Sequence, residues 1–155
     1  MVTYKLLRMR GGKLYPLYVE PNRELPIGEW LDAQVGPAVD ETHVKARSGI
    51  LSLRPGFHST DIPFADWIGV RVGESLCRRP GDVWCECEVI GNQVNVEAKN
   101  GLRQIPDGWY YFRTNPKQIR PWIISDRIKI VRVLSDEEVD AICYANGVVP
   151  QPLAV

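Results

Sequence analysis

Short runs in which apolar and polar residues alternate dominate this chain. In residues 4–9, every second side chain faces the same way, as in a β-strand. Gly11 and Gly12 tolerate the positive φ of a tight turn, so residues 4–9 and 14–19 are predicted to form a hairpin. The clearest strand is 83–90, and Gly91-Asn92 predicts a second hairpin in which residues 94–98 pair back. Further strands are expected at residues 50–53, 109–113, 122–125 and 128–134.

Helical signals are fewer. Ser135 followed by Glu138 has the spacing of a capping box, and Gly147 is a stop signal, so a C-terminal helix is predicted between them. Its buried stripe would consist of Val139, Ile142 and Cys143. Residues 62–68 carry Pro63 in a potential first turn and apolar residues at helical spacing, which predicts a second, short helix.

The remaining segments complete the expected architecture. Residues 29–35 form a short ordered piece of unassigned type, and residues 36–48 are expected to be a loop. The total is about seven or eight strands and two or three short helices. Because regular helices do not separate the strands, a mainly antiparallel α+β fold is predicted. At 155 residues, the chain is expected to form one compact domain over residues 1–147 with a tail at 148–155.

Composition narrows the classes of function. Lys plus Arg total 19 and Asp plus Glu total 19, a balance that argues against coating nucleic acid or an anionic membrane. No long apolar run or signal peptide is visible, so a cytoplasmic protein, with its four cysteines as thiols, is expected. The basic runs at 8–10 and 78–79 stand beside turn signals and are expected to be solvated turn charges.

The cysteines of the clearest strand favour packing over metal binding. Cys85 and Cys87 share one face with Val83 and Val89, and free cysteine packs as a small hydrophobic residue. A structural zinc site usually has paired ligands with two to four residues between them, whereas only Glu86 stands between these two cysteines. We expect buried thiols and no metal.

The opposite face of this strand carries Trp84, Glu86 and Glu88. One interpretation is a solvated outer face. The other is a catalytic pair of carboxylates about 7 Å apart, one stabilising a developing cation and the other orienting an acceptor. The sequence leaves both open.

A polar cluster follows the break at Pro55-Gly56. His58, Ser59 and Thr60 lie there, and the segment is interpreted either as a hydrogen-bonded turn or as a site on a strand edge. The His-x-Thr pattern of two-histidine phosphoesterases is present only once, and no nucleophile elbow or phosphate-binding loop is found. The aromatic segment 109–116 is expected to be mostly core, with some surface able to stack on a base or nicotinamide.

The whole chain resembles a family of small uncharacterised proteins encoded by phages and conjugative elements of gut bacteria. This resemblance implies a mobile-element setting and brings no activity with it. It is carried by Lys13-Leu14-Tyr15-Pro16, Arg54-Pro55-Gly56-Phe57-His58, Val83-Trp84-Cys85-Glu86-Cys87-Glu88, Arg113-Thr114-Asn115-Pro116 and Pro121-Trp122-Ile123-Ile124.

Three short pieces also resemble the Arg–Ser–Glu signature of ADP-ribosyltransferases. They are Arg8 on the first strand, the run Phe57-His58-Ser59-Thr60-Asp61, and Glu86-Cys87-Glu88. Asp61 departs from the family's final serine, and the two glutamates lie within a predicted strand rather than before one.

The transferase resemblance assigns roles to these residues. It implies NAD as substrate, with the phosphates held by Arg8 and the rest of the cofactor site formed by His58, Ser59 and Thr60. Glu88 would stabilise the oxocarbenium ion and Glu86 would orient the acceptor. The sequence therefore suggests an ADP-ribosyltransferase-like protein of a phage or mobile element. The alternative is a non-enzymatic protein that binds and inhibits a bacterial defence component, either a protein or a nucleotide signal.

Overall fold

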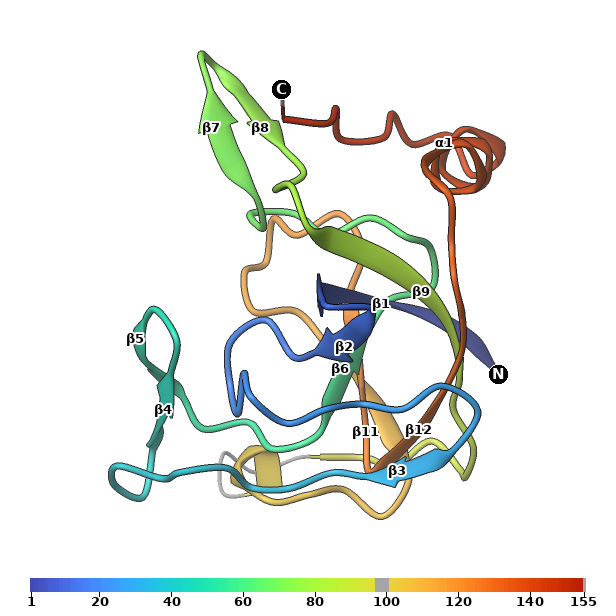
Figure 1. Ribbon diagram of the computed structural model, residues 1–155. Helices are drawn as coiled ribbons and strands as arrows, with labels where there is room; N and C mark the ends of the chain where they lie inside the picture. Colours follow the sequence, from blue (N-terminus) through green and yellow to red (C-terminus); the bar gives the residue numbers. More distant parts are fainter. Residues whose placement is uncertain (97–100, 155) are drawn as a thin grey trace.

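A five-stranded antiparallel sheet forms the centre of the molecule (Figure 1). The computed structural model describes residues 1–96 and 101–154. Strand β1 pairs with β9 over seven residue pairs, from Val2 opposite Glu88 to Arg8 opposite Asp82. The order across the sheet is β2 (Lys13–Tyr15), β1 (Val2–Arg10), β9 (Asp82–Glu88), β12 (Arg127–Val133) and β3 (Trp30–Asp32).

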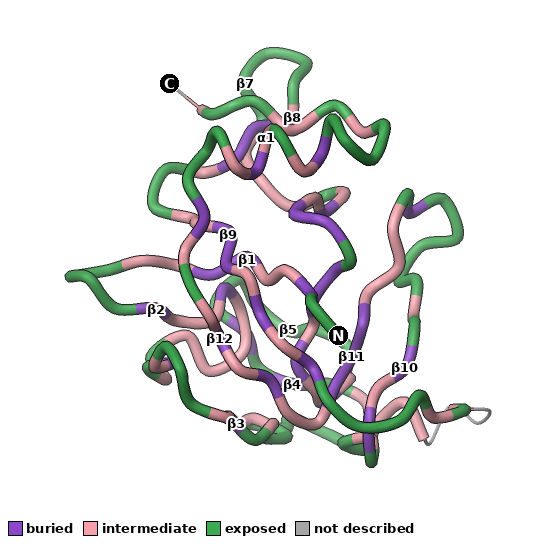
Figure 2. The backbone as a smooth tube through the Cα atoms, turned by 90° about the vertical axis from the view of Figure 1, so that its right-hand side faces the viewer, coloured by how far each residue is buried: buried purple, intermediate pink, exposed green. Residues whose placement is uncertain are grey.

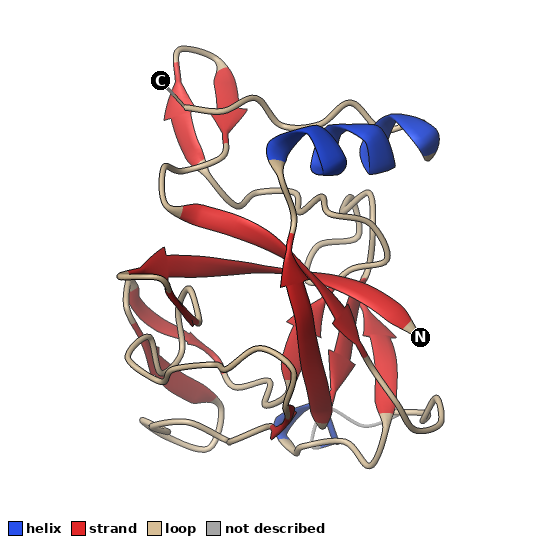
Figure 3. Ribbon diagram, turned by 45° about the vertical axis from the view of Figure 1, so that its right-hand side comes forward, coloured by secondary structure: helices blue, strands red, loops and turns tan. Residues whose placement is uncertain are grey.

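Three smaller sheets and one helix complete the fold (Figure 3). A three-stranded sheet has the order β10 (Trp109–Phe112), β11 (Trp122–Ser125) and β6 (Phe57–Ser59). It is joined to β1 by backbone hydrogen bonds between Tyr4 and Thr60. The other elements are the hairpins β4 (His43–Ala46)–β5 (Gly49–Ser52) and β7 (Val70–Val72)–β8 (Ser75–Cys77), the 3-10 turn η1 (Gly101–Arg103) and the helix α1 (Asp136–Ala145).

Each face of the central sheet carries a hydrophobic core, and Figure 2 marks the buried residues in purple. On one face, Leu7 of β1 packs with Cys85 and Cys87 of β9 in what we term the first core. On the other, Leu6 and Trp84 pack against α1 and the segment 62–68 in the second core. Because neighbours in a strand point to opposite faces, the adjacent pair Leu6-Leu7 contributes one side chain to each core.

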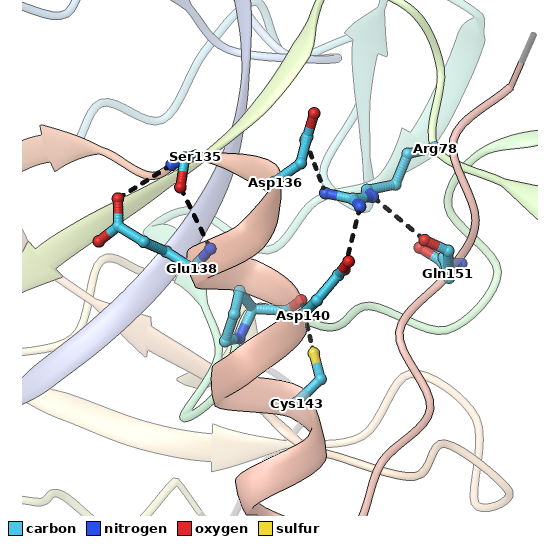
Figure 4. Close-up of polar contacts among 8 residues, drawn as sticks. Arg78, Ser135, Asp136, Glu138, Asp140, Cys143 and Gln151 are labelled. Carbon is cyan, nitrogen blue, oxygen red and sulfur yellow. Dashed lines mark hydrogen bonds and ion pairs between the residues drawn. The ribbon is translucent and has the colours of Figure 1, made fainter.

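The predicted fold class is confirmed. The described strands are antiparallel within every sheet, and the predicted helix is present near the C-terminus, although the described residues form one α-helix and one 3-10 turn rather than two or three helices. The capping box is also present. The Ser135 hydroxyl accepts from the Glu138 amide and the Glu138 carboxylate accepts from the Ser135 amide, both at 3.1 Å (Figure 4). Cys85 and Cys87 are fully buried, as predicted.

The prediction of a helix at residues 62–68 is wrong. Trp67 has φ 69°, and the Ile62 and Pro63 carbonyls accept from the Thr60 hydroxyl and the Cys143 thiol. Phe64, Ala65 and Ile68 reach the second core from an irregular backbone. The apolar spacing thus reflects packing against that core and not a helical repeat.

Three strand boundaries also differ from the expectation. The strand predicted at 14–19 ends at Tyr15, and the expected loop 36–48 contains β4. Residues 94–96 do not pair with β9, whose neighbours are β1 and β12, and the Val94 amide instead donates to Trp109. Residues 97 and 98 lie outside the described residues.

Arg78 corrects the expectation of solvated turn charges. Its side chain is only 6% exposed and pairs with Asp136 at 3.2 Å and Asp140 at 3.4 Å, while its Nε donates to the Gln151 carbonyl (Figure 4). Its backbone bonds to Pro152 and Ala154. Arg78 therefore attaches the described part of the predicted tail to both β8 and α1. Within residues 1–96 and 101–154, no helix has the length and apolar character needed to cross a membrane.

Candidate functional site

Arg8 has a structural role at one end of the β1–β9 ladder. Its Nη1 donates to the Pro80 carbonyl at 2.8 Å and pairs with Asp82 at 3.0 Å. The Asp82 side chain is almost fully buried and also pairs with Arg79 at 2.9 Å. The two arginines therefore neutralise a buried carboxylate, and neither is a solvated turn charge.

Glu86 and Glu88 lie on the outer face of β9 and are matched by cations on β12. Glu86 pairs with Arg132 at 3.5 Å and Glu88 with Lys129 at 3.3 Å. The register places Arg8 and Glu88 on the same face but six positions apart along the ladder, because Asp82 is opposite Arg8. At the rise of an antiparallel strand that separation is about 20 Å.

Ser59 and Thr60 are fully buried. The Ser59 hydroxyl donates to the Ile123 carbonyl at 3.4 Å, and the Thr60 hydroxyl lies within hydrogen-bonding distance of the Ile62 and Tyr4 carbonyls. The Ser59 hydroxyl thus bonds β6 to β11, and the Thr60 hydroxyl links the residue after β6 to β1. The cleft that the transferase resemblance implies, with Arg8, Ser59 and Glu88 together, is not formed by the described residues.

His58 is the exception among the predicted site residues, because it lines a pocket of about 580 Å³. That volume is within the range of small-molecule sites. The walls come from segments far apart in the chain. They are contributed by β1, residues 16–20, Arg23, residues 33–34, the end of β5 with Arg54, residues 56–58, residues 66–68, residues 114–115, Gln118 and Trp122. The pocket borders both cores, since Phe57 belongs to the first and Leu6 and Trp122 to the second.

Three cations line this pocket: Lys5, Arg23 and Arg54. The Lys5 ammonium and the Arg23 guanidinium lie 6.0 and 5.7 Å from the centre of the Phe57 ring, and the Arg54 guanidinium lies 4.6 Å from that of Phe112. Within the described part of the chain, none of the three forms an ion pair. Unpaired cations on aromatic faces are suited to hold an anion.

Lys5 is partly buried in the wall of the pocket. Its Nζ donates to the His58 carbonyl at 2.8 Å. Burial lowers the pKa of Lys5 to about 8, since the charged form is taken out of water without a carboxylate partner. An anion that enters the pocket would supply the missing counter-charge.

The ring of His58 is held from two sides. It meets Trp122 edge to face, with the ring centres 5.6 Å apart, and its Nδ1 lies 3.3 Å from the Gly56 carbonyl. Gly56 has φ 136°, and a Cβ there would lie 2.5 Å from Ile124, so only glycine fits. Burial, together with the charge of Lys5, lowers the pKa of His58 to about 4.

The pocket also contains two carboxylates and two unusual backbone conformations. Asp66 accepts from the Ile119 amide at 3.0 Å. Glu20 has φ 51° and Trp67 has φ 69°, and both line the pocket. They are the only non-glycine residues with positive φ in the described ranges. Such conformations cost free energy and concentrate at functional sites.

A second hollow, of about 290 Å³, is a weaker candidate. Its walls include Asp107, Asp126 and Arg127. Arg127 already pairs with Asp32 at 3.2 Å and lies over the Trp30 ring. This hollow therefore lacks both the volume and the unpaired cations of the larger pocket.

Sequence reasoning found His58 but missed the other pocket residues. The usable signal was Lys5, a charged residue on the strand face that otherwise carries Thr3, Leu7 and Met9. Within the described residues, no group of three or more His, Cys, Asp and Glu side chains is arranged to hold a metal.

Comparisons of the chain with protein-family models, with curated proteins and with solved structures give no match.

Proposed function

We propose that the protein binds an anionic nucleotide in the pocket of Lys5 and His58 and acts by holding it. The observation that carries this proposal is the set of three unpaired cations, each on an aromatic face, around one pocket. Phosphates would pair with these cations, and a base would stack on aromatic surface such as Trp122.

The partly buried position of the Lys5 ammonium adds energetic support. An unpaired charge out of water destabilises the fold, and residues kept at such a cost commonly serve binding. The pocket lining also contains Glu20 and Asp66, so the three cations exceed the carboxylates by one. With His58 neutral, the pocket retains a net positive charge that favours an anion.

The residues of the pocket are suited to binding a nucleotide rather than to transferring a group from it. NAD is a member of this ligand class, but Glu86 and Glu88 lie outside the pocket lining and are paired with β12. In the mobile-element setting that the sequence resemblance implies, the ligand would be a nucleotide signal of the bacterial host, sequestered from a defence system.

Calorimetric titration with the four ribonucleoside triphosphates and NAD tests the proposal. Arg54→Ala should weaken binding at least tenfold, because it removes an unpaired cation from the pocket. Arg71→Ala is the matched control, since Arg71 is exposed on β7 and donates only to Glu74 in its own turn. Glu88→Gln should leave the affinity unchanged. No binding at millimolar ligand, or equal loss in the Arg71 control, contradicts the proposal.

A further inference from the structure

The hydrogen bond between His58 and Gly56 determines the tautomer of the histidine. A carbonyl oxygen can only accept, so the Nδ1 that lies 3.3 Å from the Gly56 oxygen carries the proton. In the neutral ring, Nε2 then has a free lone pair and acts only as an acceptor.

This acceptor is open to the pocket. His58 lines the pocket, and across residues 1–96 and 101–154 its Nε2 makes no hydrogen bond. Nor is Nε2 one of the fully covered unpaired atoms there, so a donor entering the pocket can reach it.

The surroundings keep the ring neutral. The Lys5 ammonium donates to the carbonyl of His58 itself, and Arg54 also contributes positive charge. Two nearby cations and burial all disfavour an imidazolium, which is why the pKa of His58 falls to about 4. Nε2 therefore remains an acceptor at neutral pH.

The position of Lys5 determines where a bound anion would lie relative to His58. Since Lys5 Nζ is 2.8 Å from the His58 carbonyl, an anionic group paired with Lys5 lies beside His58. The ligand must then present a hydrogen-bond donor close to its anionic group. In a nucleotide, the sugar hydroxyls are the donors nearest the phosphates, and the base edge is farther away.

We infer that His58 Nε2 accepts a hydrogen bond from a ribose hydroxyl, so that the pocket selects ribonucleotides against nucleotides whose sugar lacks hydroxyls. This inference rests on the proposed function. It names the part of the ligand that is recognised and makes His58 the residue that determines specificity. A bound ligand that covers Nε2 without offering a donor leaves this acceptor unpaired, which is costly and is how such a site rejects the analogue.

The test compares each ribonucleoside triphosphate with its 2′,3′-dideoxy counterpart by calorimetry. Wild-type protein should bind the ribo form at least tenfold more tightly. His58→Phe keeps an aromatic ring but removes the acceptor, and it should weaken the ribo form to the level of the dideoxy form while leaving the latter unchanged. His58→Gln, whose Oε1 can accept, should retain part of the preference.

The possible failures are distinguishable. Equal affinity of wild-type protein for the two forms, or equal weakening of both by His58→Phe, overturns the inference on His58 and leaves nucleotide binding standing. Absence of binding by every nucleotide at millimolar concentration overturns the proposed function and this inference together. Circular dichroism of the His58 variants, recorded beside wild type, shows whether a loss of binding is a loss of folding.

Discussion

The ammonium of Lys5 donates to the carbonyl oxygen of His58 at 2.8 Å, which joins strand β1 of the central sheet to β6 at the wall of the pocket. Burial lowers the pKa of both residues, and the charge of Lys5 further lowers the pKa of His58. One cation and one neutral acceptor are therefore held side by side.

Replacing Lys5 should raise the stability of the protein and weaken its binding of nucleotides. Lys5→Met keeps the length of the side chain but removes the unpaired charge, and it should stabilise the protein at pH 7 by about 1–2 kcal/mol. Pocket water can replace the lost donor to His58. The same variant should bind nucleoside triphosphates at least tenfold more weakly. Chemical denaturation and calorimetry measure the two effects.

Lys45→Met is the matched control, since Lys45 is exposed on β4 and outside the pocket lining. It should change neither stability nor affinity by a measurable amount. A Lys5→Met protein that unfolds at lower denaturant than wild type would show that the charge is compensated in the fold.

The stabilising effect of Lys5→Met should depend on pH. The pKa of Lys5 is about 8 in the folded protein and near 10.5 when unfolded, so between these values the unfolded chain binds more protons. Wild-type stability therefore gains relative to the variant as pH rises from about 8 toward 10.5. Denaturation of both proteins at pH 7 and pH 9.5 measures this. A difference in unfolding free energy that stays constant would mean that the pKa of Lys5 is not lowered.

His58 should make the protein sensitive to acid. Its pKa is about 4 when folded and near 6.5 when unfolded, so the unfolded state binds more protons in this interval. The stability that neutral His58 contributes is complete above pH 6.5 and is lost as pH falls toward 4, by on the order of 3 kcal/mol. His58→Phe should show a shallower decline over that range. Parallel curves for the two proteins would contradict the assignment.

The helix cap gives a prediction that should leave binding untouched. Ser135→Ala removes the hydroxyl that accepts from the Glu138 amide and should cost about 1 kcal/mol. Ser135 lies outside the pocket lining, so nucleotide affinity should stay at the wild-type value. A thermal melt identical to that of wild type would show that the hydroxyl does not stabilise α1.

Arg78 should control the order of the C-terminal residues. Arg78→Met removes the two ion pairs to α1 and the bond to Gln151, while its partners Asp136 and Asp140 remain partly solvated. We expect a loss of about 2 kcal/mol and faster proteolysis of residues 148–154. Thermal melts and limited proteolysis beside Arg71→Ala test this. Unchanged cleavage of the tail would show that Arg78 does not hold it.

Local signals in the sequence predicted local structure well. The capping box at Ser135 and the buried face of Cys85 and Cys87 follow from spacing within one element. The hairpin β7–β8 was not predicted because its strands have three residues each and only one buried residue, Cys77, too few to show an alternating pattern. The helix predicted at 62–68 is absent because apolar side chains at helical spacing can also reach a core from irregular backbone.

The pocket could not be predicted in the same way, because tertiary pairing assembles it. Lys5 and His58 are 53 positions apart, and Phe57, which lies near both Lys5 and Arg23, meets them only in the folded chain. Short motifs suggested Arg8, Ser59 and Glu88 as one site, but the β1–β9 register separates Arg8 from Glu88. The order of motifs along a chain does not reveal how its strands are aligned. That register depends on strand pairing and on which side chains are buried.

Localising a bound nucleotide tests the central claim most directly. In ¹⁵N–¹H correlation spectra, adding a ribonucleoside triphosphate should produce saturable shifts at the Trp122 indole and at the amides of Lys5, Phe57 and His58. The amides of Glu86 and Glu88 should not move, because neither residue lines the pocket. Shifts centred on Arg8 and Glu88, or no saturable shift at millimolar ligand, would contradict a nucleotide site in the pocket of Lys5 and His58.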